Sequence, residues 1–478
     1  LVEEAIIKML AQLDPHSTYS DAEEVKKMNE PLQGNFEGIG VQFQMIEDTL
    51  LVVQPVSNGP SEKIGILAGD RIIAVNDSAI AGVKMSTEEI MKRLRGPKGS
   101  KVNLKIVRRG VQDPLVFTVK RDKIPILSLD ASYMIQPKTG YIRINRFGAT
   151  TAEEFKKAMK ELQKQGMKDM ILDLQGNGGG YLNAAIDLAN EFLGQKELIV
   201  YTEGRTAKRS DFYAKGNGEF RNGRLIVLVD EYTASASEIV SGAVQDWDRG
   251  IIVGRRSFGK GLVQRPIDLP DGSMIRLTIA RYYTPAGRCI QKPYDSSTDY
   301  NKDLIDRFNH GELMNADSIH FPDSLKVQTK KLKRTVYGGG GIMPDYFVPI
   351  DTTLYTDYHR KLVGKGVIIK FTMKFIEDHR KELADKYKKF DSFNEKFVID
   401  DDMLATLREM GEKEGVKFNE EQYQKALPLI KTQLKALIAR DLWDMNEYFR
   451  VMNTTNESVQ KALEILNSEE YQKKLRAN

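Results

Sequence analysis

Three short apolar runs, each followed by a turn rich in glycine or other small residues, constrain the fold of this chain more than any other feature. The runs lie at residues 170–174, 225–229 and 250–253. Their length and their β-branched residues are typical of strands buried on both faces of a parallel sheet. A predicted strand at 141–144 and a predicted helix at 152–165 precede them, so residues 123–350 are predicted to form an α/β core.

A smaller β-rich domain is predicted ahead of this core, over residues 36–122. Apolar and polar residues alternate there with a period of two, which is typical of half-buried strands. One amphipathic helix interrupts the strands over 86–94. Residues 1–35 are predicted to form a helical lead-in to the α/β core, and Pro15 ends its first helix because proline disfavours helical geometry in the preceding residue.

After about residue 352 the strand signals mostly vanish, and apolar residues recur at helical spacing. The stripe consists of Leu434, Leu437, Ile438, Leu442, Met445, Phe449 and Met452. It predicts a C-terminal helical domain over 351–478. The stripe is either the core of that domain or a face through which two copies of the chain pair.

Composition excludes several classes of protein. Of the 478 residues 41% are hydrophobic and 29% are charged, and no apolar stretch approaches the about 20 residues of a membrane-spanning helix. The formal net charge of +4 gives no electrostatic reason to expect nucleic acid or an anionic membrane as a partner. The single cysteine, Cys289, excludes an intramolecular disulfide, and the histidines show no metal-ligand spacing, so we expect no metal and no cofactor.

Two glycine-rich loops come close to nucleotide-binding motifs without satisfying them. Residues 254–261 match the pattern G-x-x-x-x-G-K-[ST] except at Gly261, where the hydroxyl that binds magnesium is missing. Residues 176–180 miss the dinucleotide pattern because Tyr181 stands at the position of the third glycine. We therefore expect no nucleotide, although the second loop can still expose its backbone amides.

Ser235 is the first candidate for chemistry. The strand at 225–229 leads within a few residues into a predicted helix that begins near this serine. The free amides and the positive end of the macrodipole at a helix N-terminus stabilise negative charge, as acyl transfer requires. The spacing of Ser235 and Glu238 is also that of a capping box, and this stretch alone favours the structural interpretation.

Lys260, one predicted strand downstream, shifts the interpretation toward catalysis. A lysine, with a reference pKa of about 10.4, acts as a base near neutral pH only when it is buried or close to another cation. Gln264 lies four residues further on and can orient the amine by hydrogen bonding. Together with the amide-rich loop at 178–180, these residues supply a nucleophile, a base and oxyanion donors, but their sequence positions do not show whether they converge in space.

Four ordered blocks resemble the signature blocks of the C-terminal processing peptidases, also called tail-specific proteases. The blocks lie at residues 173–180, 233–239, 255–264 and 280–287. Residues 36–122 similarly resemble the PDZ domain that this family inserts before its protease core, and residues 14–19 resemble the sequence just ahead of that domain. The resemblance covers about residues 1–350, and no family block matches the region after 352.

The resemblance implies a role for each candidate residue. Ser235 would be the nucleophile, Lys260 the general base and Gln264 its partner. The backbone amides of Gly180 and Ala236 would form the oxyanion hole. The PDZ loop that binds the substrate's C-terminal carboxylate would consist of Gly38, Ile39, Gly40 and Val41.

Two positions depart from the family pattern Asp-Leu-Arg-x-Asn-x-Gly-Gly. Gln175 stands where arginine is usual, and Gly176 follows it. The backbone donors of the loop remain available in spite of this change. Asp246 matches an acidic position of the family whose role looks structural rather than catalytic.

The function implied by the resemblance is that of a bacterial serine endopeptidase, periplasmic or facing the cell envelope, which cleaves protein substrates near a free C-terminus. The PDZ domain would recognise the substrate tail or gate the site, and the helical domain at 351–478 would offer a face for a homo-oligomer. Two alternatives remain open: a PDZ-containing scaffold with a degenerate protease fold, and an acyl-thioester enzyme with the same oxyanion loop. The presence of Ser235, Lys260 and Gln264 argues against the scaffold.

Overall fold

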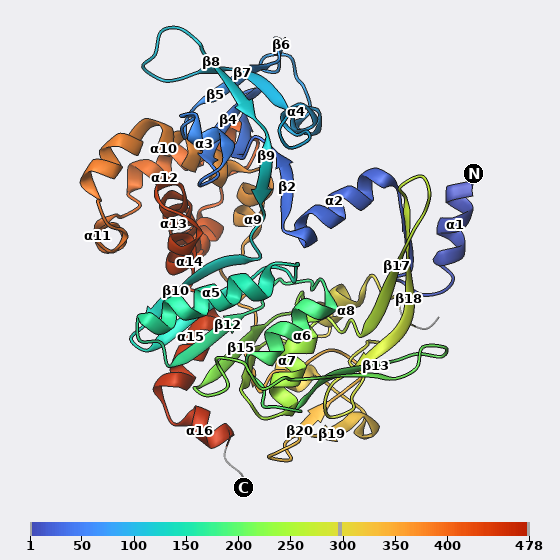
Figure 1. Ribbon diagram of the computed structural model, residues 1–478. Coiled ribbons are helices and arrows are strands. Elements are labelled where there is room, and N and C mark those ends of the chain that lie inside the picture. The colour runs from blue at the N-terminus through green and yellow to red at the C-terminus, as the bar shows by residue number, and fades with distance from the viewer. Residues whose placement is uncertain (1, 295–298, 476–478) are drawn as a thin grey trace. The chain divides into compact units, whose positions relative to one another are not determined.

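The computed structural model describes residues 2–294 and 299–475, so residue 1 of the predicted lead-in and residues 476–478 of the predicted helical domain lie outside it. The chain forms two compact units, and each unit is built from segments that are separate in the sequence (Figure 1). Unit 1 contains residues 2–34, 127–351 and 453–475, and unit 2 contains residues 35–126 and 352–452. No helix within the described residues has both the length and the apolar character needed to cross a membrane.

A six-stranded sheet forms the centre of unit 1. In spatial order its strands are β10 (Leu129–Gln136), β11 (Thr139–Ile144), β12 (Asp169–Asp173), β15 (Leu225–Val229), β16 (Ile251–Gly254) and β21 (Tyr346–Phe347). From β11 to β21 the strands are parallel, with Leu172 opposite Val227 and Val227 opposite Ile252, whereas β10 is antiparallel to β11. Every residue of β12, β15 and β16 is buried, as the three apolar runs predict.

Helices cover both faces of this sheet. One face shares its core with α5 (Thr151–Lys164), α6 (Leu182–Asn190) and α7 (Ala236–Asp246). The alternate residues of the same strands, among them Ile171, Ile226 and Leu228, are equally buried but point to the opposite face. On that face α15 (Glu457–Asn467) contacts β15 and β16 and buries Val459, Ala462, Ile465 and Leu466.

Polar contacts also fix this C-terminal segment to the sheet. Arg224 donates to the carbonyl oxygen of Leu466 at 2.6 Å, and the amide of Leu225 donates to the hydroxyl of Tyr471, in α16 (Glu470–Lys474), at 2.9 Å. Residues 453–475 therefore complete the second face of the α/β core. The sequence pattern instead predicts them as part of the helical domain at 351–478.

A second sheet of unit 1 is antiparallel. It runs β1 (Thr18–Ser20), β18 (Met274–Tyr283), β13 (Leu198–Glu203) and β14 (Ser210–Tyr213), and β17 (Leu262–Asp268) also pairs with β18. The remaining elements of the unit are α1 (Val2–Leu10), α2 (Ala22–Gln33), α8 (Asp303–Asn309), two 3-10 helices (Ala316–Ser318 and Asp323–Leu325), β19 (Lys326–Gln328) and β20 (Thr335–Tyr337).

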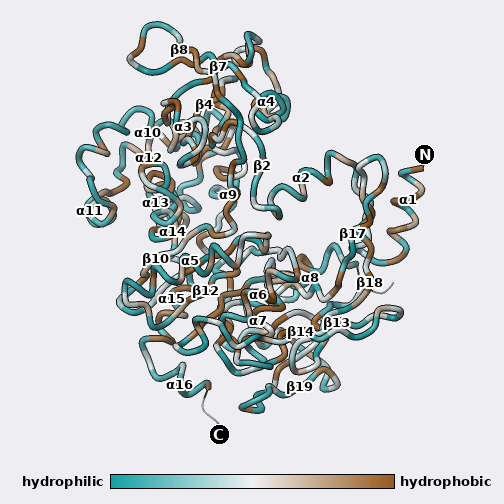
Figure 2. The backbone as a smooth tube through the Cα atoms, in the orientation of Figure 1, coloured by the Kyte–Doolittle hydropathy of each residue, from teal (hydrophilic) through white to brown (hydrophobic). Residues whose placement is uncertain are grey.

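Unit 2 contains the predicted β-rich domain. The strands of its main sheet are, in spatial order, β3 (Val41–Ile46), β4 (Thr49–Pro55), β5 (Arg71–Val75), β7 (Lys101–Val107) and β8 (Leu115–Lys120), and β6 (Ser78–Ala79) also pairs with β5. A separate two-stranded sheet consists of β2 (Asn35–Gly38) and β9 (Asp122–Pro125). The helices of this domain are α3 (Pro60–Lys63) and α4 (Thr87–Leu94). Along β7 buried and exposed residues alternate strictly, and Figure 2 shows the matching change of hydropathy. Among the described strands β3 pairs only with β4, so its other edge is open.

Six helices form the other part of unit 2: α9 (Asp357–Gly364), α10 (Val367–Lys386), α11 (Phe390–Lys396), α12 (Asp401–Lys413), α13 (Glu420–Leu442) and α14 (Met445–Met452). Leu434 and Ile438 of the predicted apolar stripe are fully buried in their common core, and Met452 packs against it. For these residues the structure favours the core interpretation of the stripe.

Helix α10 packs against the β-rich domain within unit 2. Arg71 donates to both carboxylate oxygens of Glu377, at 2.9 and 3.0 Å. Leu51 of β4 is buried although it lies outside the core cluster of its own sheet. With Met373 and Ile376 of α10 it lines a cavity of about 30 Å³. The helices thus cover one face of β4.

The docking of α15 predicts that Ile465→Ala destabilises unit 1. Ile465 is fully buried, and truncation of such a side chain typically lowers the free energy of unfolding by about 2–5 kcal/mol. Urea unfolding followed by the fluorescence of Trp247 in a Trp443→Phe background measures this, because the chain has two tryptophans and Trp247 alone lies in unit 1.

The exposed neighbour Glu464 supplies the matched control, and Glu464→Ala is expected to change the free energy of unfolding by less than about 0.5 kcal/mol. Equal transition midpoints for the two variants would contradict the docking of α15.

Candidate active site

Ser235 occupies a sharp connection between β15 and α7. It is the residue before the first turn of α7, with φ 57° and ψ −114°, a conformation that is rare for residues other than glycine. The side chain of Glu238, one turn into the helix, accepts a hydrogen bond from the Ser235 amide at 2.8 Å. The serine side chain is half-buried, so the turn presents a hydroxyl at the helix N-terminus.

The buried carboxylate of Glu238 joins this turn to a second loop. Besides the amide of Ser235, it accepts the amides of Gly259 at 2.7 Å and Lys260 at 2.9 Å, and the hydroxyl of Ser257 at 2.5 Å. One oxygen, Oε2, receives both the Ser235 and the Lys260 amide, so the two backbones lie next to each other. Burial raises the pKa of the Glu238 carboxyl, and the four donors act in the opposite direction.

The ammonium of Lys260 lies in a partly buried environment. Burial lowers its pKa, the nearby Arg276 cation acts in the same direction, and Glu238 and Asp14 oppose them. Within the described residues no hydrogen bond joins the side chains of Ser235 and Lys260. The backbones are held together, and catalytic hydrogen bonds between side chains often form only when substrate is bound.

Gln264 is held by the lead-in segment. Its side-chain nitrogen donates to the carbonyl oxygen of His16. The carboxylate of Asp14 fixes this turn by accepting the amides of His16 at 2.8 Å and Ser17 at 3.0 Å, and the Thr278 hydroxyl at 2.9 Å ties the turn to β18. Gln264 thus contacts the carbonyl oxygen of His16, a partner that the sequence analysis did not consider.

The ring of His16 lies beside the proposed base. Its Nε2 is 2.7 Å from the hydroxyl of Tyr300. Burial, and after it the nearby Lys260 cation, lower the pKa of His16 to about 4, although the Asp14 carboxylate acts in the opposite direction. The imidazole is therefore neutral at neutral pH.

The glycine-rich loop packs directly against Ser235. The carbonyl oxygen of Asn177 accepts the amide of Ala234 at 2.9 Å and the hydroxyl of Ser237 at 3.0 Å. A Cβ atom added to Gly179 would lie 2.8 Å from the Cβ of Ser235, so only glycine allows this approach. The loop and the start of α7 thus share one wall of the site.

Two backbone amides next to Ser235 have no acceptor. Within residues 2–294 and 299–475, the amides of Gly180 and Ala236 donate to no protein atom. Gly180 is held in place by its pairing with Phe147, and its positive φ of 148° suits glycine. These are the two positions that the family resemblance implies as oxyanion donors.

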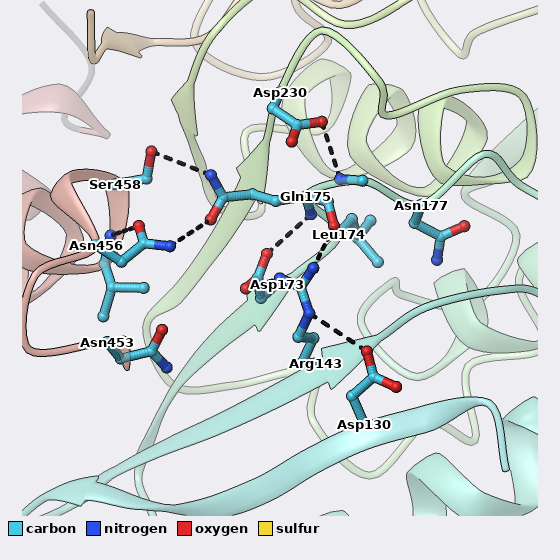
Figure 3. Close-up of polar contacts among 12 residues, drawn as sticks. Asp130, Arg143, Asp173, Leu174, Gln175, Asn177, Asp230, Asn453, Asn456 and Ser458 are labelled. Atoms are coloured by element: carbon cyan, nitrogen blue, oxygen red, sulfur yellow. Dashed lines mark hydrogen bonds and ion pairs between the residues drawn. The ribbon is translucent and has the colours of Figure 1, made fainter. Parts of the chain in front are cut away.

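Gln175, which stands where the family pattern has arginine, lies at the start of the glycine-rich loop (Figure 3). Arg143 donates to Asp173 at 2.5 Å and to the Gln175 carbonyl oxygen at 2.8 Å. The Gln175 side chain turns instead to the C-terminal segment, donating to Ser458 at 3.4 Å and accepting from Asn456 at 3.3 Å. Residues 453–475 thus also contact the base of this loop.

Asp246 lies at the opposite end of α7 from Ser235. It is fully buried and pairs with Arg288 at 2.6 Å, and it also accepts the amide of Ala286 at 2.8 Å. The pair ties α7 to the segment that follows β18. Asp246 therefore holds α7 in place and lies away from Ser235.

The PDZ loop lies in unit 2 between β2 and β3. The carbonyl oxygen of Ile39 accepts the amide and the hydroxyl of Ser61, at 3.2 and 2.6 Å, while Gly40 has a positive φ of 72°. In the part of the chain that the structure describes, the amides of Ile39 and Gly40 donate to no protein atom. Val41 begins β3, whose outer edge is open.

Known families cover most of the chain. The sequence matches peptidase family S41 over residues 138–298, a PDZ domain over 38–123 and a family of unknown function (DUF8443) over 358–444. It is 40% identical over 298 residues to the carboxy-terminal-processing protease of Bartonella bacilliformis, covering 61% of this chain and 67% of that protein. The chain belongs to peptidase family S41. This S41 peptidase is also 38% identical over 296 residues to the carboxyl-terminal-processing protease of Synechocystis sp., covering 60% and 68% of the two chains.

A solved structure of a photosystem II D1 C-terminal processing protease is 32% identical, covers 60% of this chain and 78% of that one, and has a TM-score of 0.36. The relatives confirm the resemblance inferred from the four blocks and identify this S41 peptidase as a member of the carboxy-terminal-processing serine proteases. The S41 match includes the segments that carry Ser235, Lys260 and Gln264.

The position of His16 beside Lys260 predicts that Lys260→Met raises the pKa of His16 from about 4 toward its ordinary value of 6.5, because it removes a neighbouring cation. NMR of histidine-labelled protein measures this, with His16→Gln used to assign the signal. Lys164→Met, at an exposed site on α5, is the control and is expected to leave the midpoint unchanged.

The lowered pKa also makes folding pH-dependent. The unfolded chain binds a proton at His16 below about pH 6.5 that the folded protein binds only near pH 4. Acidification across this window therefore destabilises unit 1 through His16, and less so in Lys260→Met. A His16 midpoint that is the same in both lysine variants would contradict the geometry.

Proposed function

We propose that this S41 peptidase is a serine endopeptidase in which Ser235 is the nucleophile and Lys260 the general base. The observation that supports this most is the shared contact at Glu238, where one carboxylate oxygen accepts the amides of both residues. The unpartnered amides of Gly180 and Ala236 beside Ser235 supply the oxyanion site. A scaffold with a degenerate site has no use for this combination.

The chemistry follows from these groups. Neutral Lys260 takes the hydroxyl proton of Ser235 while the Ser235 oxygen attacks the scissile carbonyl carbon. The amides of Gly180 and Ala236 stabilise the resulting oxyanion. The Lys260 ammonium then protonates the leaving amine, and an acyl-enzyme remains. Water, deprotonated by Lys260, attacks the ester carbonyl carbon and releases the new C-terminus, with the proton returning to Ser235.

Gln264 orients the lysine in this scheme. Its side-chain nitrogen is committed to the carbonyl oxygen of His16, so its oxygen is the atom that can accept from the Lys260 ammonium. A hydrogen bond from the Lys260 ammonium to the Gln264 oxygen favours the protonated form of Lys260 during proton transfer. The lead-in turn at residues 14–17 thereby acts on the base through Gln264.

For unit 2 we propose recognition of substrate tails. The consecutive free amides of Ile39 and Gly40 can hold a terminal carboxylate, and the open edge of β3 can pair with the extended chain that precedes it. The substrates are then proteins with free, apolar C-termini. As part of the same proposal, the enzyme acts in the periplasm or at the cell envelope, as the resemblance implies.

Ser235→Ala and Lys260→Ala are each expected to lower kcat by about 10³-fold or more, because nucleophile and base act as one unit. Cleavage of a loosely folded protein with an apolar C-terminus measures this. Ser241→Ala is the matched control on the same helix, since its hydroxyl donates only to the carbonyl oxygen of Ser237 one turn away. Full activity in Ser235→Ala would overturn the assignment and favour the scaffold alternative.

Amidation of a substrate's C-terminus is expected to weaken its binding about 10-fold or more, because hydrogen bonds to a charged group contribute about 1.5–3 kcal/mol. Fluorescence anisotropy with the Ser235→Ala protein, using free-acid and amidated forms of one peptide, measures binding without cleavage. Equal affinities would show that the loop at Gly38, Ile39, Gly40 and Val41 does not bind the terminal carboxylate.

A further inference from the structure

Two adjacent tyrosines at the end of β18 have different surroundings. Tyr283 is half-buried, and its ring stacks on Tyr201 with centroids 4.8 Å apart. Tyr282 is buried in the core of unit 1, and its hydroxyl reaches the active site. That hydroxyl donates to the carbonyl oxygen of Ser235 at 3.0 Å and also contacts the carbonyl oxygen of Lys260.

The Tyr282 hydroxyl can act only as a donor to these two carbonyl groups. Burial raises the pKa of its phenol well above the ordinary value of 10.0, so it keeps its proton. A carbonyl oxygen carries no proton to give in return. The single phenol proton is therefore shared between two backbone carbonyl oxygens, one of Ser235 and one of Lys260.

This contact complements that of Glu238. Glu238 accepts the amides of Ser235 and Lys260, and the Tyr282 hydroxyl contacts their carbonyl oxygens, so the backbone of each residue is held at its amide and at its carbonyl. The two clamping residues come from different layers. Glu238 is on α7, which packs on the six-stranded sheet, and Tyr282 is on β18 of the antiparallel sheet.

We propose that Tyr282 is a positioning residue for the peptidase, whose hydroxyl locks the backbone of Lys260 against that of Ser235. The inference rests on the proposed function of these two residues. Tyr282 itself contacts neither the substrate nor the reacting atoms. Through the Tyr282 hydroxyl, the antiparallel sheet keeps the backbones of Ser235 and Lys260 in a fixed position relative to each other.

The two carbonyls depend on Tyr282 to different degrees. The Ser235 carbonyl oxygen also accepts the amides of Glu238 at 2.9 Å and Ile239 at 3.1 Å, so α7 keeps its first turn without the phenol. Among the described residues, Tyr282 is the sole donor to the Lys260 carbonyl oxygen. Loss of the hydroxyl thus acts mainly on the position of the base.

The test is Tyr282→Phe, which keeps the buried ring and removes only the hydroxyl. We expect kcat to fall about 10–100-fold, as for displacements of about 1 Å at other active sites, with KM within about twofold. The limb of the pH profile that reports Lys260 is expected to move to higher pH, because a loosened loop is better hydrated. Deuterium exchange in a peptide covering residues 258–262 is expected to become faster.

Tyr283→Phe is the matched control, since it removes a hydroxyl one residue away without touching either carbonyl, and all three measurements should equal those of the unmodified protein. If Tyr282→Phe retains the kcat, the pH profile and the exchange rate of that protein, the positioning role is wrong. A pH limb and exchange rate that stay fixed while only thermal stability falls would also overturn it, because the hydroxyl would then be structural.

The outcomes separate this inference from the proposed function. Activity that survives in Ser235→Ala refutes the nucleophile, and the exchange measurement on Tyr282→Phe is still interpretable because it needs no turnover. Activity that disappears in Ser235→Ala but is normal in Tyr282→Phe leaves the peptidase assignment intact and removes only Tyr282 from it.

Discussion

The candidate site at Ser235 and Lys260 depends on one buried group, the carboxylate of Glu238. A buried carboxylate is costly unless donors surround it, and here the four donors come from the start of α7 and from the loop at 257–260. Because the two segments satisfy the same group, neither can move away without leaving that group with unmet hydrogen bonds. The strained backbone of Ser235 persists in this setting.

The architecture of unit 1 was largely predictable from local patterns. Apolar runs at β12, β15 and β16 identify strands buried on both faces, and the structure confirms the α/β class. The return of α15 to the core was not predictable, since an amphipathic helix shows that it has an apolar face but not what covers that face. Residues 351–478 therefore read as one helical stretch, although 453–475 lie with the core.

The proposed active site was predictable in its residue types more than in its contacts. Ser235 and Lys260 stood out by chemistry, whereas their approach depends on Glu238, whose spacing from Ser235 was interpreted only as a helix cap. The partner of Gln264 is a backbone carbonyl, which every residue possesses and which leaves no signal in sequence. Tyr282 lies in a family block, but its reach to two carbonyls depends on how the two sheets meet.

The order of segments in the two units has a consequence for how the chain is connected. Both parts of unit 2 are insertions, because the chain leaves unit 1 after residue 34 and returns at 127, then leaves after 351 and returns at 453. Four covalent crossings therefore link the units, and a single cut in any one of them leaves three intact. A protease that cuts one linker produces two polypeptides, but the remaining three crossings still join unit 1 to unit 2, so the chain topology protects the enzyme against separation of its two units.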